Sequence, residues 1–408
     1  MNLRQRRKKH LGNASSFFYK QPLHIVKGED VWLIDSNGKR YLDVYNNVAH
    51  IGHTNPEVVD AISKQAATLN TNTRYIHESI IQLAEQLIAT MDKGLEVCYF
   101  CCSGSEANDL ALQLARNYTQ QKGCLVTKNA YHGNTSVVFQ MSPEDCSLEF
   151  REDWVGLVGG PREYLDNKEK HLSDSFKVAE ELKKEGHAPA AFIADNIFSS
   201  DGIFSVPEGY LKDMYDLVRS FNGLTIADEV QSGFGRTGKY MWGFQHDDVV
   251  PDIVTLGKPM GNGHPLAAVI TTHEIAQTFN KKHGYFNTFG GNPVAAAAGL
   301  AVIKYIHKHG LIEHAKSVGS YFKEGLEQLA SSLNTIEDVR GSGLFIGVEL
   351  RSNSEASEAL ERLLDEGILV GQTGPDNKVL KLRPPITFKK EHADIAIQGI
   401  KKALTPRA

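Results

Sequence analysis

The 408-residue sequence has little net charge, no long apolar run and no apolar leader, and each absence excludes a class of protein. Its formal net charge is −5, whereas proteins that neutralise many nucleic-acid phosphates carry a basic excess. No run approaches the roughly 20 apolar residues that a membrane helix needs. The first ten residues, MNLRQRRKKH, lack the apolar stretch of a secretory signal. We therefore expect neither a nucleic-acid partner nor a membrane partner.

Cysteine is also scarce. The five cysteines are an odd number at irregular spacing, which is unlike a disulfide framework and favours a reducing, cytoplasmic location. Cys98, Cys101 and Cys102 lie in one apolar run without a second cluster of matching spacing, so we interpret them as small core residues. The sixteen histidines show no metal-ligand spacing either. The sequence predicts no metal site.

Neither an internal repeat nor a long linker divides the chain, and from about residue 55 helical patterns alternate with short apolar runs. Helical periodicity fits residues 56–69, 79–91, 105–120 and 174–186. The expected strands are residues 97–102, 123–127, 190–195, 223–229, 252–257 and 266–272. Strands that are apolar on both faces and separated by helices predict an α/β fold with a buried, mainly parallel sheet.

Both ends of the chain show a different pattern. Residues 31–35 and 39–45 flank Asn37-Gly38, which is a strong signal for a β-hairpin turn. After about residue 300 a long helix leads to apolar runs at 343–350, 367–371 and 379–383. We therefore predict a large domain at residues 51–300 and a small α+β domain at residues 301–408. The N-terminal segment, residues 1–50, is expected to join the small domain.

Small residues follow one of the expected strands, at the edge where open α/β sheets bind their ligands. The run at 97–102 leads into Ser103-Gly104-Ser105 and then into an amphipathic helix. Small residues let backbone N–H groups approach an anion, and the helix N-terminus stabilises its charge. This pattern favours a phosphate cradle over a plain helix cap. After the strand at 123–127, Tyr131 and His132 place an aromatic ring at the same edge.

Two further strand ends carry charged side chains. The strand expected at 223–229 ends in Asp228-Glu229, and an Asp buried there needs a cationic or hydrogen-bond-donating partner. The strand at 252–257 runs into Lys258, whose amine can react with a carbonyl group if its pKa is lowered. A phosphate cradle, an acid that holds a pyridine nitrogen protonated and a reactive lysine are the parts of a pyridoxal 5′-phosphate enzyme. Their order on successive strand ends predicts such an enzyme.

The chain resembles the class III (ω-type) aminotransferases, which are pyridoxal-phosphate enzymes of fold type I with a large, mainly parallel α/β domain and a smaller α+β domain. The resemblance covers nearly all of the chain. Several motifs agree in order and spacing: SGSEAN (103–108), YHG (131–133), ADEVQSGFGRTG (227–238), TLGKPMGNGHP (255–265) and FNTFGGNP (286–293).

The resemblance implies a role for individual residues. Lys258 matches the catalytic lysine that binds the cofactor, and Asp228 matches the partner of the pyridine nitrogen. Tyr131 and Val230 match the residues on the two faces of the ring, and Gln231 matches the partner of the cofactor hydroxyl. The other expected cofactor-binding residues are Ser103, Gly104, Ser105, His132 and Thr288.

Thr288 matches a phosphate ligand that the neighbouring subunit lends. The resemblance therefore implies a homodimer with shared active sites, or a tetramer built from such dimers.

Within the family, the chain looks most like the branch of phospho-lyases and alanine–glyoxylate aminotransferase 2-like proteins. The similar stretches include RRKKHLG (6–12), LDVYNNVAHIGHTNP (42–56), LNTNTRYIHE (69–78) and SGSEANDLALQLAR (103–116). Lyases of this branch act on phosphoethanolamine or phosphohydroxylysine, and related bacterial lyases act on 1-hydroxy-2-aminoethylphosphonate.

The resemblance thus implies a lyase that acts on a small phosphorylated or phosphonate amine and releases ammonia and an aldehyde. The alternative is an ordinary aminotransferase with pyruvate, glyoxylate or 2-oxoglutarate as acceptor. ADNIFSSDG (194–202) and LRPP (382–385) depart from the animal phospho-lyase pattern, so the substrate and the leaving group stay open.

A dianionic substrate needs cationic partners. Our candidates are Arg383, Arg74 and Lys20. Arg383 comes first, because an Arg in this C-terminal stretch often holds the substrate carboxylate in the family. We expect Arg236, in GFGRTG, to order its own loop.

Two rival classes fit less well. GFGRTG (233–238) matches the dinucleotide fingerprint but lacks the strand–turn–helix context that a nicotinamide oxidoreductase shows. A pyridoxal-binding regulator carries an added DNA-binding module, and the first ten residues, five of which are Arg or Lys, are too few to fold into one.

Overall fold

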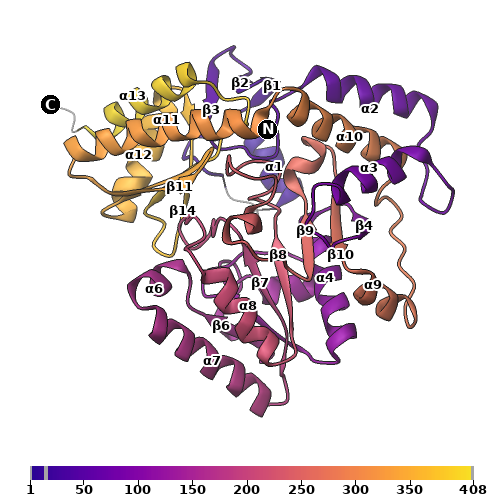
Figure 1. Cartoon of the computed structure of the whole chain (residues 1–408). Helices are drawn as coiled ribbons and strands as arrows, with labels where there is room; N and C mark the ends of the chain where they lie inside the picture. The colour runs from indigo at the N-terminus through magenta and orange to yellow at the C-terminus, as the bar shows by residue number, and fades with distance from the viewer. Residues whose placement is uncertain (1, 13–16, 406–408) are drawn as a thin grey trace.

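A seven-stranded sheet forms the centre of the larger part of the molecule in this computed structural model, which describes residues 2–12 and 17–405 (Figure 1). Its strands are Val97–Cys101 (β4), Gly123–Thr127 (β5), Val155–Val158 (β6), Pro189–Asp195 (β7), Leu224–Asp228 (β8), Ile253–Leu256 (β9) and Ala267–Thr271 (β10). They lie in the order β4-β10-β9-β8-β7-β5-β6. β10 runs antiparallel to both neighbours and the other pairings are parallel, so the predicted mainly parallel sheet is confirmed.

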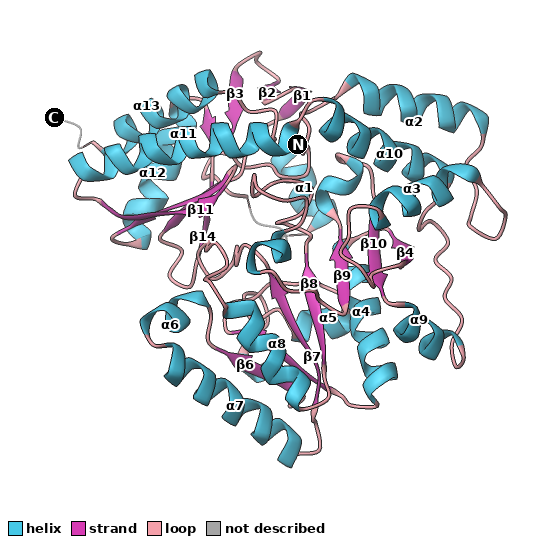
Figure 2. Cartoon of the chain, in the orientation of Figure 1, coloured by secondary structure: helices cyan, strands magenta, loops and turns pink. Residues whose placement is uncertain are grey.

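Helices cover both faces of this sheet (Figure 2). The strands β5, β8, β9 and β10 are therefore buried at every residue. The helices of this part are Pro56–Thr68 (α2), Glu78–Ile88 (α3), Gly104–Thr119 (α4), Ser136–Gln140 (α5), Pro161–Asp166 (α6), Lys168–Lys184 (α7), Tyr210–Ser220 (α8), His273–Asn280 (α9) and Pro293–Lys308 (α10). Short 3₁₀ turns span Leu148–Phe150, Gly243–Asp247 and Lys258–Gly261, and an N-terminal helix, α1, spans Leu3–Leu11. Within the described ranges, no helix is long and apolar enough to cross a membrane.

Capping side chains determine where these helices begin. The Asn55 carboxamide accepts from the first backbone amides of α2, and the Ser103 hydroxyl accepts from Glu106 N–H at the start of α4. α7 begins at Lys168, six residues before the predicted start, because Asn167 accepts from Lys170 N–H at 2.9 Å. Apolar periodicity alone gave no sign of this polar first turn.

The two chain ends meet in a four-stranded sheet. The predicted hairpin is Trp32–Asp35 (β2) paired with Arg40–Asp43 (β3). Ile25–Glu29 (β1), which the prediction lacked, adds to β2, and Ile368–Leu369 (β13) adds to β3 in parallel. This pairing supports our proposal that the N-terminal segment belongs to the small C-terminal domain.

A second, antiparallel four-stranded sheet completes the C-terminal part. It consists of Ile336–Ser342 (β11), Phe345–Leu350 (β12), Gly371–Thr373 (β14) and Val379–Leu382 (β15), in the order β11-β12-β15-β14. Its helices are Leu311–Ser332 (α11), Asn353–Asp365 (α12) and Lys390–Leu404 (α13). The long helix predicted after about residue 300 is α11, which begins only at Leu311 because Gly310 takes a left-handed φ of 58° and separates it from α10.

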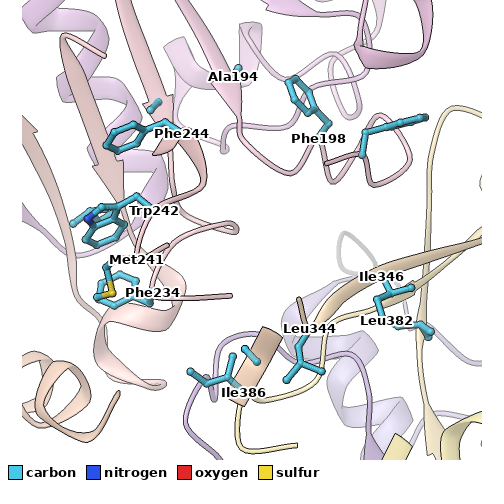
Figure 3. Packing of buried hydrophobic residues seen from close by; sticks show 14 of the residues in the cluster. Ala194, Phe198, Phe234, Met241, Trp242, Phe244, Leu344, Ile346, Leu382 and Ile386 are labelled. Atoms are coloured by element: carbon cyan, nitrogen blue, oxygen red, sulfur yellow. The ribbon is translucent and has the colours of Figure 1, made fainter. Parts of the chain in front are cut away.

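One continuous apolar cluster joins the two parts. Figure 3 shows Phe234, Met241 and Trp242 from the loop after β8, and Leu344 and Leu382 from the C-terminal sheet, all members of this cluster. Burial of both sides in one cluster favours a fixed orientation of the C-terminal sheet over the large sheet.

Arg236 lies within this junction, and its predicted role was too narrow. Its buried guanidinium donates to the carbonyl oxygens of Leu344 and Pro384, and its other terminal nitrogen lies 3.0 Å from His50 Nδ1. Burial and the positive charge of Arg383 lower the pKa of Arg236 to about 9. Arg236 therefore connects the large sheet to both chain ends, and does not merely order its own loop.

A tight backbone contact gives a test of this packing. A Cβ on Gly319 of α11 would lie 2.2 Å from the Gly343 carbonyl oxygen. We expect Gly319→Ala to lower the free energy of unfolding by about 1–3 kcal/mol, although alanine is the better helix former. In the control Gly325→Ala, the new methyl meets only the terminal methyl of Ile397, so stability should change by less than about 1 kcal/mol. Denaturant titration checks both, and equal stability of the two variants would contradict the packing.

Candidate active site

A cavity of about 360 Å³ opens at the carboxyl edge of the seven-stranded sheet. Residues from the ends of β4, β5, β7, β8 and β9 and from the segment before β10 form its wall. The lining residues are Val48, Cys102, Ser103, Gly104, Ser105, Tyr131, His132, Gly133, Asp195, Asp228, Val230, Gln231, Lys258, Gly263, His264, Pro265 and Leu266. The cavity thus brings together the side chains that the sequence placed on successive strand ends.

Lys258 opens a 3₁₀ turn directly after β9 and its side chain is half-buried in the cavity wall. Burial lowers the pKa of this amine, and the positive charge of Arg383 lowers it further. The carboxylates of Asp228 and Asp195 oppose this shift. A lowered pKa increases the fraction of neutral amine, which is the nucleophilic form.

Asp228, at the end of β8, is buried and held by polar groups on three sides. Its Oδ2 lies 2.7 Å from His132 Nδ1 and accepts from Asn108 Nδ2 at 2.9 Å. Its Oδ1 accepts from the Val230 backbone N–H at 3.0 Å. The carboxylate is therefore fixed at the cavity wall.

Glu229 points the opposite way, because successive side chains of a strand alternate between its faces. Its buried carboxylate accepts four hydrogen bonds: from Asn196 Nδ2, Ser232 Oγ, Gly243 N–H and Phe244 N–H, at 2.7–2.8 Å. The Asp-Glu pair thus divides into one carboxylate for the cavity and one that holds the loop 229–244.

The cradle after β4 is narrow because glycines and small side chains approach each other there. A Cβ on Gly104 would lie 3.0 Å from Val230 Cγ1, and a Cβ on Gly133 would lie 2.4 Å from Ser105 Oγ. Gly133 also has a φ of 140°, which L side chains rarely adopt. The Ser105 hydroxyl bonds to Asn134, and the Ser103 hydroxyl caps α4. The space at this helix N-terminus suits a phosphate group.

The cavity walls also offer the surfaces that a flat ring needs. The half-buried ring of Tyr131 and the buried side chain of Val230 both line the cavity. Gln231 Oε1 accepts from Asn47 Nδ2 at 3.1 Å and from the Arg383 guanidinium, while Gln231 Nε2 donates to Ser199 Oγ at 2.6 Å.

These residues fit pyridoxal phosphate. Asp228 offers a buried carboxylate for the pyridine nitrogen, Lys258 offers the amine for the aldehyde carbon, and the glycine-lined cradle leaves room for the phosphate. His132 Nε2 is buried without a hydrogen-bond partner among the described residues, which is consistent with a site designed around a further group. The fold and this site define a pyridoxal-phosphate-dependent enzyme of fold type I.

Within that class, the chain belongs to the class-III aminotransferase family, whose model matches residues 17–404. It is 41% identical to an alanine–glyoxylate aminotransferase 2-like protein of Drosophila melanogaster, over 98% of this chain and 86% of that protein. It is 37% identical to an ethanolamine-phosphate phospho-lyase homologue of Caenorhabditis elegans, over 98% of this chain and 92% of that protein. A phospholyase from Arthrobacter, solved in complex with phosphoethanolamine, matches with a TM-score of 0.96 and 40% identity over 99% of both chains.

Four of the predicted residues do not line the cavity: Arg383 is buried beside it, and the other three are exposed. Arg74 is exposed and its guanidinium stacks over Phe286 at 4.3 Å. Lys20 is exposed at the surface of the C-terminal part, where its backbone N–H donates to Glu361. Thr288 is exposed as well. We therefore drop Arg74 and Lys20 as anion ligands of the cavity in their own chain.

Other residues of the site were missed. Asn108 bridges Asp228 and Thr255 Oγ1, which donates to it at 2.6 Å, and its place in SGSEAN could have marked it. Asp195 lines the cavity at the end of β7, and burial raises the pKa of its carboxyl, helped by the nearby charge of Asp228. Lys381 is buried on β15, and only the spatial arrangement reveals that it faces the large domain.

The four hydrogen bonds of Glu229 predict a stability effect separate from chemistry. In Glu229→Gln the amide nitrogen would face the backbone N–H of Gly243 or of Phe244, so at least one of the four bonds would be lost and the others would no longer have a charged acceptor. We expect the free energy of unfolding to fall by about 2–4 kcal/mol. The exposed Glu208→Gln is the control and should leave denaturant stability unchanged. If Glu229→Gln were as stable as that control, Glu229 would not hold the loop.

Proposed function

We propose that this enzyme is a lyase that removes ammonia and a β-substituent from a small phosphorylated or phosphonate amine. One observation carries the proposal: Arg383 is buried beside the cavity, and its partners are neutral. Its Nε donates to the Tyr45 carbonyl oxygen at 3.0 Å and its terminal nitrogen donates to Gln231. A buried cation without a carboxylate partner is unfavourable until an anion joins it, so the substrate should bring one. The similarity to the Arthrobacter phospholyase favours a phosphate as that anion.

In this proposal Lys258 and Asp228 have different roles in the reaction. The bound cofactor supplies an electron sink for the charge left on the α-carbon. Lys258 would take the proton from that carbon when its amine is neutral, and Asp228 would keep the pyridine nitrogen protonated. The β-substituent would leave with the electron pair of its bond, and water would then release the nitrogen as ammonia and leave an aldehyde. Elimination outruns transamination if the protein holds the leaving group perpendicular to the ring.

The alternative is a class III aminotransferase that uses pyruvate, glyoxylate or 2-oxoglutarate as acceptor. It is supported by the Drosophila relative and by a transaminase from Virgibacillus, which matches with a TM-score of 0.89 and 26% identity over 98% of this chain and 97% of that chain. The two reactions share all the cofactor-binding residues and differ in how the anion is held.

We also propose a homodimer in which Thr288 contributes to the neighbouring site. Thr288 lies between Phe286 and Phe289, which are 46% and 70% exposed, and exposed aromatic side chains of this size mark interaction surfaces. Arg74 packs on Phe286, so both residues would reach the neighbouring subunit together.

The reaction is tested by incubating the holoenzyme with phosphoethanolamine, phosphohydroxylysine or 1-hydroxy-2-aminoethylphosphonate, without any oxo acid. We expect ammonia in amounts far above the enzyme concentration, and phosphate with it if phosphate is the leaving group. A single stoichiometric conversion of the amine, restored to turnover only by an oxo acid, would show an aminotransferase instead.

The role of Lys258 is tested by Lys258→Ala. We expect turnover to fall at least 1,000-fold, because the variant lacks both the cofactor-binding amine and the base. The absorbance of the covalently held cofactor should vanish, whereas the melting temperature of the cofactor-free protein should change little, since the Lys258 amine makes no hydrogen bond within the described chain. Retained turnover would refute the assignment.

A further inference from the structure

Lys381 is a second buried cation beside the active site. Only 7% of the residue is exposed, and its ammonium has neither a hydrogen bond nor an ion pair with any residue in the described parts of the chain. Burial, and next the positive charge of Arg383, lower the pKa of Lys381 to about 7. Glu144 and Asp195 act in the opposite direction, and Lys258 adds to the lowering. The groups that influence it therefore include two residues of the cavity wall.

Strand geometry shows which way this side chain points. Val379 belongs to a small cluster with Ile197 and Ile203 of the loop after β7. Side chains two apart on a strand share a face, so Lys381 points toward the large domain as Val379 does. Arg383 directly follows the strand, and its contacts with Gln231 and with the Phe345 ring place its guanidinium on the same side. Leu380 and Leu382 lie on the other face, where Figure 3 shows Leu382 beside Ile346 of β12.

The sheet neighbours of Lys381 are glycines, and other side chains cover them: a Cβ on Gly371 would lie 2.3 Å from the Tyr45 ring, and a Cβ on Gly347 would lie 3.1 Å from Ile203 Cβ. Its partners in register are Gly347 on β12 and Gly371 on β14, neither of which has a side chain. The ammonium therefore has no neighbour across the sheet that could satisfy it, and it is directed at the loops of the large domain.

The nearby carboxylates are already engaged. Glu144 accepts from Ser200 Oγ at 2.7 Å, and Asp195 accepts from the backbone N–H groups of Ile197 and Ser199. Glu349, on the same face of the sheet, is bound by three cations further along: Arg162, Arg340 and Lys378. Within the described chain, Lys381 and Arg383 are thus two buried cations on one strand face without a carboxylate bonded to either.

We propose that Lys381 and Arg383 together form the subsite for the substrate's dianionic phosphate or phosphonate, and that Lys381 is its specificity-determining residue. This inference rests on the proposed function. A bound dianion raises the pKa of Lys381 again and keeps its amine protonated, so that two cations then match the two negative charges. A substrate carboxylate, with a single charge, requires only one cation. The charge count on β15 therefore selects phosphorylated amines over amino acids.

Equilibrium binding of 2-aminoethylphosphonate to the holoprotein tests the subsite, because this amine carries the dianion but no β-leaving group. Titration calorimetry would compare the wild type with Lys381→Gln, Lys381→Arg and the exposed control Lys401→Gln. One charge-assisted hydrogen bond corresponds to a loss of roughly 10- to 100-fold in affinity. We expect that loss in Lys381→Gln, a smaller loss in Lys381→Arg, and none in Lys401→Gln.

Two further measurements distinguish a role of Lys381 in ligand binding from a role in folding stability and from a role in the reaction. Lys381→Met should melt no lower than the wild type, because an unpaired buried ammonium does not stabilise a fold. In turnover of phosphoethanolamine, Lys381→Gln should raise KM more than it lowers kcat. A lower melting temperature of Lys381→Met with unchanged ligand affinity in Lys381→Gln would assign a structural role and overturn the proposal.

The outcomes also distinguish this inference from the proposed function. If the wild type releases ammonia from phosphoethanolamine but Lys381→Gln binds the phosphonate as well as the wild type, the subsite is overturned and the lyase stands. If Lys381→Gln loses affinity but the wild type releases no ammonia, the lyase fails and the anion subsite stands. A wild type that does not bind 2-aminoethylphosphonate overturns the subsite as well.

Discussion

The carboxyl end of β8 is the point on which the rest of the structure depends. Two adjacent carboxylates leave this strand in opposite directions, Asp228 into the cavity and Glu229 into the loop that follows. Glu229 accepts from the backbone N–H groups of Gly243 and Phe244, so both ends of that loop are held at the end of β8. Arg236 lies within the same loop and binds the carbonyl oxygens of Leu344 and Pro384. The strand that carries the cofactor's acid therefore also sets the position of the C-terminal sheet.

This chain of contacts explains how a separate sheet contributes to the active site. Pro384, which Arg236 holds, directly follows Arg383, and Arg383 in turn reaches Gln231, which comes from the other end of the Arg236 loop. The contacts form a closed circuit, so β15 cannot shift along the cavity without breaking buried hydrogen bonds. Such a circuit positions Arg383 and Lys381, which we propose bind the anion, relative to Lys258, and the proposed elimination would depend on that positioning.

The sequence predicted best what local patterns control. Strands that are buried on both faces, turn residues such as Asn37-Gly38, and small residues after β4 each act through the nearest few positions, and the structure has the strands and the hairpin there. Features that depend on distant segments were missed or misplaced. β1 becomes a strand only because β2 offers an edge, and Arg74 was proposed for the cavity from its charge alone. The order of charged and small residues on strand ends predicted which of them line one cavity, because parallel strands bring their carboxyl ends to one edge.

Lys381 illustrates the limit most clearly. In the sequence it is one of two basic residues in an apolar strand, and alternation predicts only that it shares a face with Arg383. What lies opposite that face is decided by the packing of the C-terminal sheet on the loop after β7. The overall charge of −5 likewise says nothing about this site, since the acidic residues lie elsewhere or are already bonded. A protein of negative net charge can bind a dianion when two cations are buried together. In the empty site the two positive charges repel each other and destabilise each other's charged form, and a bound anion relieves this repulsion. A single carboxylate would neutralise only one of the two charges, so part of the repulsion would persist in that complex. A dianionic phosphate would neutralise both, which gives a physical reason for such a site on an aminotransferase scaffold to prefer a phosphate.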